Sequence, residues 1–327
     1  MQLLLRSLAL LVAMGALPAP GQDERKTVTP EGPSRVALTY LGGAGWIISD
    51  GRVTIVIDPF VSRPRFSEAP GKTLEQVPGE QRPIHSATDP LVPDEAAIDK
   101  RIPKADYVLI HHSHVDHMLD APYLARSRGA QLIGHESATN IARAGGVPDS
   151  QLITVRGGED YEFGSFSLRV IPSLHSTLDR KHYYDSRTAP RDIKLPQSSR
   201  GYPEGGSLAY LIRIGGRKIL TFGSMNYIER ELEGLRPDVV LVGWNRSQVE
   251  NYDYLGRLMR VLDRPPIVLP THWDDGSLPF ESPQTEAWKR LEAFRKEVRA
   301  LSPATRVIIP RYFEPVELPP VRPHSAR

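Results

Sequence analysis

His111-His112-Ser113-His114-Val115-Asp116-His117 is the stretch of this sequence that decides the fold. It follows directly on the apolar run Tyr107-Val108-Leu109-Ile110, whose aliphatic and β-branched residues are typical of a buried strand. The pattern of residues 119–128, just after the cluster, predicts a short helix. The cluster therefore lies at a strand-to-helix junction, where functional residues concentrate in α/β folds.

The same run has the composition of a metal site. Read from His112, its spacing is His-x-His-x-Asp-His, which places four ligand-type residues within six positions. Neutral imidazole suits zinc. Along an extended segment His112 and His114 project to one side, while Asp116 and His117 turn back from the following loop. His111 projects to the side opposite His112, so we assign it a supporting role. Zinc takes three or four such ligands, and a catalytic site leaves one position open for water.

Two distant histidines also follow the ends of predicted strands. His175 comes after the strand expected at 166–171, and His272 after the strand expected at 267–269. Each alone would more often be a structural residue than a ligand, but the central cluster makes both candidates for completing a metal site. The remaining histidines, His85, His135, His182 and His324, are interpreted as structural.

The rest of the chain alternates strands and helices. A three-stranded meander over 36–57 opens the pattern, with Asp50-Gly51 as a two-residue hairpin turn. Further strands are expected at 107–110, 131–134, 152–155, 161–163, 166–171, 208–214, 218–222, 239–242, 267–269 and 307–309. Helices are expected at 119–128, 137–144, 228–235, 254–262 and 285–301, the last with Ser282 as its cap and Pro283 at its first position. Residues 96–100 are expected to form a turn, and 60–93 and 176–206 long loops. This alternation predicts an α/β fold with two sheets face to face and helices outside.

The two ends of the chain differ from its middle. Arg6, the apolar residues 7–17 and the small residues before Gln22 predict a cleaved secretory signal peptide over 1–21. We therefore expect a periplasmic or secreted protein, with no stable membrane anchor after cleavage. Residues 22–34 are expected to be a flexible lead-in and 316–327 a C-terminal tail. No linker interrupts 35–315, which we interpret as one domain.

Charge and cysteine content exclude several function classes. A formal net charge of +2, with 24% charged residues, argues against a nucleic-acid partner bound by bulk electrostatics. The sequence has no cysteine, so it forms no disulfide and offers no thiolate as ligand or nucleophile. The sequence leaves the oligomeric state open.

Taken together, residues 35–315 resemble a metallo-β-lactamase-fold hydrolase. The resemblance rests on Gly42-Gly43-Ala44-Gly45 after the first strand, Asp58 at a strand end, the His112-to-His117 motif, and His175 and His272 after later strands. The ending Thr271-His272-Trp273-Asp274 is more similar to the branch of lactonase-like and phospholipase-D-like members than to true β-lactamases. The resemblance implies an αβ/βα four-layer sandwich of two mixed sheets. It also implies one zinc at His112, His114 and His175, and a second at Asp116, His117 and His272.

The chain departs from this family at the position of the bridging carboxylate. That residue commonly follows a hairpin strand as Gly-Asp, whereas this chain reads Phe222-Gly223-Ser224. Serine is a neutral, weak ligand, so the second metal is expected to bind more weakly unless Asp58, Asn226 or Asp274 compensates. One or two zinc ions are expected, with iron or manganese as other candidate metals.

The predicted chemistry is hydrolysis by a metal-bound hydroxide, with Asp116 orienting the water or passing its proton to the leaving group. The expected substrate is a small lactone, ester or phosphodiester. The 176–206 loop carries six basic and four acidic residues, which favours an anionic substrate; a solvated loop of mixed charge explains the same residues equally well. The alternatives are a non-catalytic metal-binding or sensing protein of the same fold and a β-lactam hydrolase.

Overall fold

The computed structural model of this protein describes residues 35–66, 80–178 and 181–318. The predicted signal segment 1–21, the lead-in 22–34, His324 and most of the predicted tail lie outside these ranges. Within them, no helix combines the length and the apolar character that crossing a membrane requires.

In the described ranges the first sheet has seven strands, in the order β16-β1-β2-β3-β6-β7-β8. Their bounds are β1 Ala37–Gly42, β2 Gly45–Ser49, β3 Thr54–Ile57, β6 Tyr107–Leu109, β7 Gln131–Gly134, β8 Leu152–Thr154 and β16 Pro315–Glu317. The strands from β16 to β3 pair antiparallel, whereas β3, β6, β7 and β8 pair parallel. The sheet is therefore mixed, and helices form the crossover connections that its parallel strands require.

The second sheet has the order β15-β14-β13-β12-β11-β10-β9. Its strands are β9 Asp160–Glu162, β10 Phe166–Pro172, β11 Leu208–Ile214, β12 Arg217–Phe222, β13 Val239–Gly243, β14 Ile267–Thr271 and β15 Arg306–Val307. It is antiparallel from β9 to β12 and parallel from β12 to β15. The second sheet is therefore mixed as well.

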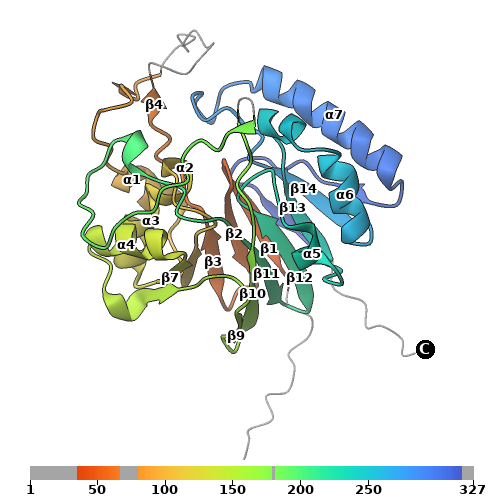
Figure 1. Cartoon of the computed structure of the whole chain (residues 1–327), viewed down its shortest axis with the longest axis horizontal. Helices are drawn as coiled ribbons and strands as arrows, with labels where there is room; N and C mark the ends of the chain where they lie inside the picture. The colour runs from red at the N-terminus through yellow and green to blue at the C-terminus, as the bar shows by residue number, and fades with distance from the viewer. Residues whose placement is uncertain (1–34, 67–79, 179–180, 319–327) are drawn as a thin grey trace, which may run out of the picture. The chain divides into compact units, whose positions relative to one another are not determined.

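Helices cover the outer faces of both sheets (Figure 1). They are α1 Glu95–Arg101, α2 Val115–Met118, α3 Ala121–Arg128, α4 Glu136–Ala144, α5 Glu229–Leu232, α6 Tyr254–Val261 and α7 Thr285–Leu301. Leu124 of α3 packs in one core with Val108 of the first sheet. Phe294 of α7 packs in another with Val268 of the second sheet. A third core, which includes Trp46, joins the two sheets. The predicted four-layer αβ/βα sandwich is thus confirmed.

Several predicted elements differ from the structure in their bounds. The helix expected at 119–128 is α3, which begins two residues later because Asp120 is its N-cap and Pro122 lies in its first turn. The short helix α2 before it was not predicted. The turn expected at 96–100 is the helix α1, whose first turn is capped by Asp94 accepting the Ala97 N–H. Only 229–232 of the helix expected at 228–235 is helical, and Gly234 beyond it has φ of +74°.

One predicted turn, one helix cap and one boundary were also wrong. Asp50 accepts the N–H groups of Arg52 and Val53, so the β2–β3 connection is a wider loop rather than a two-residue hairpin turn. The N-cap position of α7 is Gln284, whose side chain makes no capping hydrogen bond, so Ser282 is not the cap and Pro283 is not the first residue of the helix. Residues 316 and 317, assigned to the tail, belong to β16 and pair with β1. The loop expected at 60–93 contains the short parallel pair β4 Arg65–Phe66 and β5 Ile84–His85.

The segments with the candidate ligands converge where β6, β10 and β14 end. Two backbone hydrogen bonds connect segments of the two sheets there. The Leu208 N–H donates to the His111 carbonyl oxygen at 2.8 Å, and the His272 N–H donates to the Gly43 carbonyl oxygen at 2.7 Å. The packing of the two sheets therefore sets the position of the candidate site.

Candidate metal centre

Three histidines from two strand ends form a first ligand group. His112 and His114 follow β6 and His175 follows β10, and each offers a ring nitrogen within 4.8 Å of the other two. Both ring nitrogens of His112, and Nε2 of His114, are buried without a hydrogen-bond partner. Because buried polar atoms nearly always have a partner, these nitrogens fit the binding of a cation.

The imidazoles of this group are held neutral, which is the form that binds a metal. Burial, reinforced by the neighbouring histidines, lowers the pKa of His112 well below its ordinary value. Burial also lowers the pKa of His114, and burial together with His114 lowers the pKa of His175 to about 4. His175 Nδ1 lies 2.7 Å from the Ser176 carbonyl oxygen, which only accepts, so Nδ1 carries the proton and Nε2 is available as a ligand.

Asp116, His117 and His272 form a second ligand group. Asp116 Oδ2 lies 3.4 Å from His117 Nε2 and 3.1 Å from His272 Nε2. The Asp116 side chain is 33% exposed and that of His272 is 21% exposed, so this group is open to water on one side. His272 has φ of +55°, in the left-handed region that a histidine rarely adopts. The surrounding structure holds it there, as is common at functional sites.

A buried carboxylate, Asp58, supports the second group. Its Oδ2 accepts hydrogen bonds from His111 Nδ1 at 2.6 Å and from His117 Nδ1 at 2.7 Å. Burial alone would raise the pKa of Asp58, but the two histidines outweigh it and lower the pKa to about 2. Burial would likewise lower the pKa of His117, but Asp116 and Asp58 outweigh it and raise the pKa to about 10. Asp58 thus directs His117 Nε2 toward Asp116, and a metal bound there would displace a proton.

His111 has the supporting position that the sequence predicts. Its Nδ1 is bonded to Asp58, and its Nε2 lies 3.1 Å from the hydroxyl of Thr221 on β12. Since Nδ1 donates to the carboxylate, Nε2 accepts from the hydroxyl. His111 therefore connects the ligand cluster of the first sheet to the second sheet.

Ser224 supports the segment that carries His175. Its Oγ accepts the Ser176 N–H at 2.9 Å and donates to Ser176 Oγ at 3.0 Å. Asn226 Nδ2 donates to the His175 carbonyl oxygen at 3.2 Å. Among the described residues, no histidine or carboxylate belongs to both ligand groups.

Asp274, considered above as a compensating ligand, has a different set of partners. Its Oδ2 lies 2.9 Å from Arg63 Nη1 in a buried ion pair, and it accepts hydrogen bonds from the hydroxyls of Tyr40 and Tyr312 and from the Gly43 N–H. Burial would raise the pKa of Asp274, but Arg63 and these donors lower it. Asp274 therefore fixes the loop that carries His272.

The 176–206 loop borders the first ligand group. The ring of Tyr184 meets the ring of His114 edge to face, with centroids 5.6 Å apart. Arg187 pairs with Asp185 at 2.7 Å, and Lys181 with Glu250 at 2.7 Å. These two basic residues of the loop are thus already paired with carboxylates of the chain, which weakens the reason for expecting an anionic substrate.

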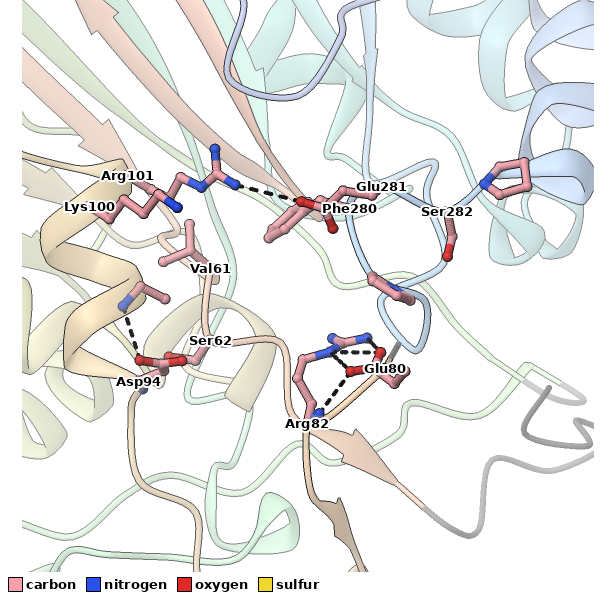
Figure 2. A pocket seen from close by; sticks show the side chains of 13 residues that line it. Val61, Ser62, Glu80, Arg82, Asp94, Lys100, Arg101, Phe280, Glu281 and Ser282 are labelled. Atoms are coloured by element: carbon pink, nitrogen blue, oxygen red, sulfur yellow. Dashed lines mark hydrogen bonds and ion pairs between the residues drawn. The ribbon is translucent and has the colours of Figure 1, made fainter. Parts of the chain in front are cut away.

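A cavity of about 560 Å³ lies between α1 and residues 279–283, and none of the six candidate ligands lines it (Figure 2). Its charged side chains are largely paired with one another, Arg82 with Glu80 at 2.6 Å and Arg101 with Glu281 at 3.8 Å. Neither of the two ligand groups found among the described residues contributes a side chain to it. The two ligand groups therefore remain the candidate site.

Sequence analysis named all six candidate ligands but missed several supporting residues. Ser176, Thr221 and Tyr184 act through contacts across the fold, for which no local motif exists. The sequence analysis placed Asp58 at the end of a strand. In the structure it directly follows β3 and has φ of +40°. Asp58 was also considered as a compensating ligand, whereas in the structure its carboxylate accepts hydrogen bonds from the rings of His111 and His117.

Known proteins are similar to this chain in sequence. A sequence model described as "Beta-lactamase superfamily domain" matches residues 37–272. A UPF0173 metal-dependent hydrolase of Archaeoglobus fulgidus is 24% identical over 283 residues, which cover 83% of this chain and 94% of the relative. One from Thermoplasma volcanium is 26% identical over 216 residues, covering 65% of this chain and 81% of the relative.

Solved structures share the fold. Igni18, a metallo hydrolase from Ignicoccus hospitalis, superposes with a TM-score of 0.57 at 19% identity and covers 87% of this chain and 99% of its own. CmlA, a diiron β-hydroxylase from Streptomyces venezuelae, gives a TM-score of 0.53 at 18% identity over 89% of this chain and 54% of its own. With the matching family model and the two ligand groups, these similarities assign the chain to the metallo-β-lactamase-fold, metal-dependent hydrolases of the β-lactamase superfamily.

Proposed function

We propose that this hydrolase is a zinc enzyme that cleaves a small ester, lactone or phosphodiester. The observation that carries the proposal is the first ligand group, in which neutral imidazoles present buried nitrogens without hydrogen-bond partners. Such a donor set suits zinc better than magnesium or calcium, which prefer oxygen ligands. Iron and manganese are the competing metals, and CmlA shows that iron occurs in this fold.

Each residue of the site has a distinct part in this proposal. His112, His114 and His175 would hold one zinc ion, and Asp116, His117 and His272 a second. When bound, zinc lowers the pKa of water toward 7 and polarises the oxygen of the bond to be cleaved. Asp116, one-third exposed, is placed to accept a proton from water and pass it to the leaving group. Asp58 keeps the His117 ring in one orientation through its hydrogen bond to Nδ1 of that ring.

We further propose that the protein is exported, because residues 1–21 have the composition of a signal peptide. Fractionation of cells that produce the full chain tests this. Mature protein that starts near Gln22 in the periplasm or medium would support export, whereas uncleaved protein in the cytoplasm would contradict it.

The test of the zinc proposal is metal analysis of the purified protein followed by a substrate panel. We expect one or two zinc ions per chain and hydrolysis of a generic lactone, a nitrophenyl ester or bis-nitrophenyl phosphate. Chelation should abolish turnover, and zinc should restore it better than iron or manganese. Undiminished turnover by metal-free protein, or recovery with iron alone, would reject the proposed role of zinc.

Ser224 provides a separate test of the first ligand group. We expect Ser224→Ala to weaken zinc binding about tenfold, because the hydroxyl that holds Ser176 beside His175 is lost. Competition with a chromogenic chelator measures this affinity, and Ser165→Ala, an exposed serine in the turn before β10, is the matched control. Equal affinities of the Ser224 and Ser165 variants would show that the contact with Ser176 does not matter.

Ser224→Asp distinguishes one metal from two. A restored carboxylate adds negative charge at the family's bridging position, so a chain that binds one zinc ion should gain a second. If the unchanged chain already binds two ions, the variant should gain neither metal nor turnover, and Ser224 belongs to a working two-metal site.

A further inference from the structure

The large apolar side chains that are exposed gather in two loop segments. Of the nine exposed large hydrophobic residues in the described part of the chain, six lie within 174–184 or 249–252. They are Leu174, Leu178, Tyr183, Tyr184, Val249 and Tyr252, which we call the apolar loop surface. Scattered exposed apolar residues are ordinary, but a concentration in two neighbouring segments indicates a binding surface.

Both segments lie beside the metal centre and are joined to each other. Leu174 directly precedes His175, and Tyr184, 57% exposed, contacts the ring of His114. Lys181 Nζ lies 2.7 Å from both the carboxylate and the carbonyl oxygen of Glu250. Residue 250 ends the 3-10 helix η4 Arg246–Glu250, which holds Val249.

The second segment, 249–252, is also held in place by a side-chain hydrogen bond. Asn251 Nδ2 donates to the Met225 carbonyl oxygen at 2.6 Å, and Met225 follows Ser224, which supports the His175 segment. Tyr252, 85% exposed, comes next in the chain. The apolar side chains are therefore presented by loops that are tied to the ligand-bearing segments.

Two basic residues of these loops are already paired with carboxylates of the chain. Lys181 and Arg187 are engaged by Glu250 and Asp185. The exposed side chains of these loops include the rings and aliphatic chains named above, whose stabilising contacts are with apolar partners.

We propose that the apolar loop surface binds an apolar acyl or alkyl group of the substrate, next to the bond that the metal centre hydrolyses. This inference rests on the proposed function and narrows it to neutral esters or lactones with an aliphatic chain. Tyr184 and Tyr252 are its specificity-determining residues. Water provides the hydroxyl of the new acid and the proton that the leaving alcohol receives.

The test is a series of nitrophenyl esters from acetate to decanoate. We expect kcat/KM of the unchanged enzyme to rise about twofold for each added methylene, since the loops cover a chain only partly. Tyr184→Ala and Tyr252→Ala should each reduce the ratio of kcat/KM for octanoate over acetate about fivefold or more. A flat series, or the same slope in the variants, would overturn the proposal.

The exposed valines provide a matched pair. Val249→Ser, at a position 75% exposed within the surface, should lower the octanoate-to-acetate ratio. Val92→Ser, 69% exposed just before α1 and outside the surface, should leave that ratio as it is. Equal ratios for the two valine variants would count against the proposal.

Binding of a neutral ketone separates this inference from the proposed function. 2-Undecanone has no hydrolysable bond, and we expect it to bind the unchanged protein at least tenfold more tightly than 2-butanone, with the difference lost in Tyr184→Ala. That result would support the apolar surface even if no ester is hydrolysed. Equal binding of the ketones would reject it. Variants that lose binding to phosphatidylcholine vesicles but keep the ester slope would instead assign the surface to a membrane and overturn the proposal.

Discussion

His114→Ala is expected to lower kcat/KM for any substrate of the panel about a thousandfold, on the order of 4 kcal/mol of transition-state stabilisation. The reason is that His114 supplies one of three donors in the first ligand group, and its Nε2 is buried without another partner. Removing it leaves two donors where zinc takes three or more from the protein. Metal content and turnover, measured on the same preparation, check the result.

The control is His85→Ala, which removes a histidine on β5 that belongs to neither ligand group. It should keep the metal content and the turnover of the unchanged enzyme. If His114→Ala retained both its zinc and most of its turnover, the first ligand group would not be the catalytic metal site. A variant that keeps zinc but loses turnover would point to a role in substrate binding.

Asp274→Ala should cost about 3 to 5 kcal/mol of the free energy of unfolding, because it leaves Arg63 as a buried charge without its partner. The two side chains are only 1% and 2% exposed and lie 2.9 Å apart. The Tyr40 and Tyr312 hydroxyls lose an acceptor as well. Urea unfolding of chelator-treated protein, followed by circular dichroism, measures the loss without a contribution from bound metal.

The matched control is the exposed pair of Arg213 and Asp160, whose nitrogen and oxygen atoms lie 2.7 Å apart. Asp160→Ala should cost less than about 1 kcal/mol, since water replaces the partner of an exposed charge. Arg63→Met combined with Asp274→Leu should be less destabilised than the sum of the two single variants, because neither charge is left alone. Equal losses for Asp274→Ala and Asp160→Ala would contradict this account.

Local patterns account for the parts of the fold that the sequence predicted. The helix 285–301 was predicted with the observed bounds because its apolar positions repeat at helical spacing over many turns. The helix predicted at 119–128 begins two residues later, at Ala121, with Asp120 as its N-cap, and the four residues of α2 before it are too few to show a helical repeat in the sequence. The position of a helix cap depends on backbone geometry, which spacing alone does not provide.

The candidate site was predictable to the extent that its residues are close in sequence. Four ligands fall within His112–His117, and the other two follow apolar strands, so strand ends were a sufficient guide. The supporting contacts join residues far apart, such as Asp58 with His117 and Ser176 with Ser224. In the sequence, Ser224 in place of a carboxylate suggested a missing ligand. In the structure its hydroxyl holds the backbone N–H of Ser176, next to His175.

The order in which the ligands occur along the chain has a consequence for biogenesis. The first ligand group is complete only when residue 175 has been synthesised, and the second only when residue 272 has. His272 must also reach the Gly43 carbonyl oxygen, more than two hundred residues earlier in the chain, before it is in place. Contacts of such large sequence separation form late and slow folding. His112 and His114 follow a strand of the first sheet and His175 a strand of the second, so even the first group is assembled only after strands of both sheets have met.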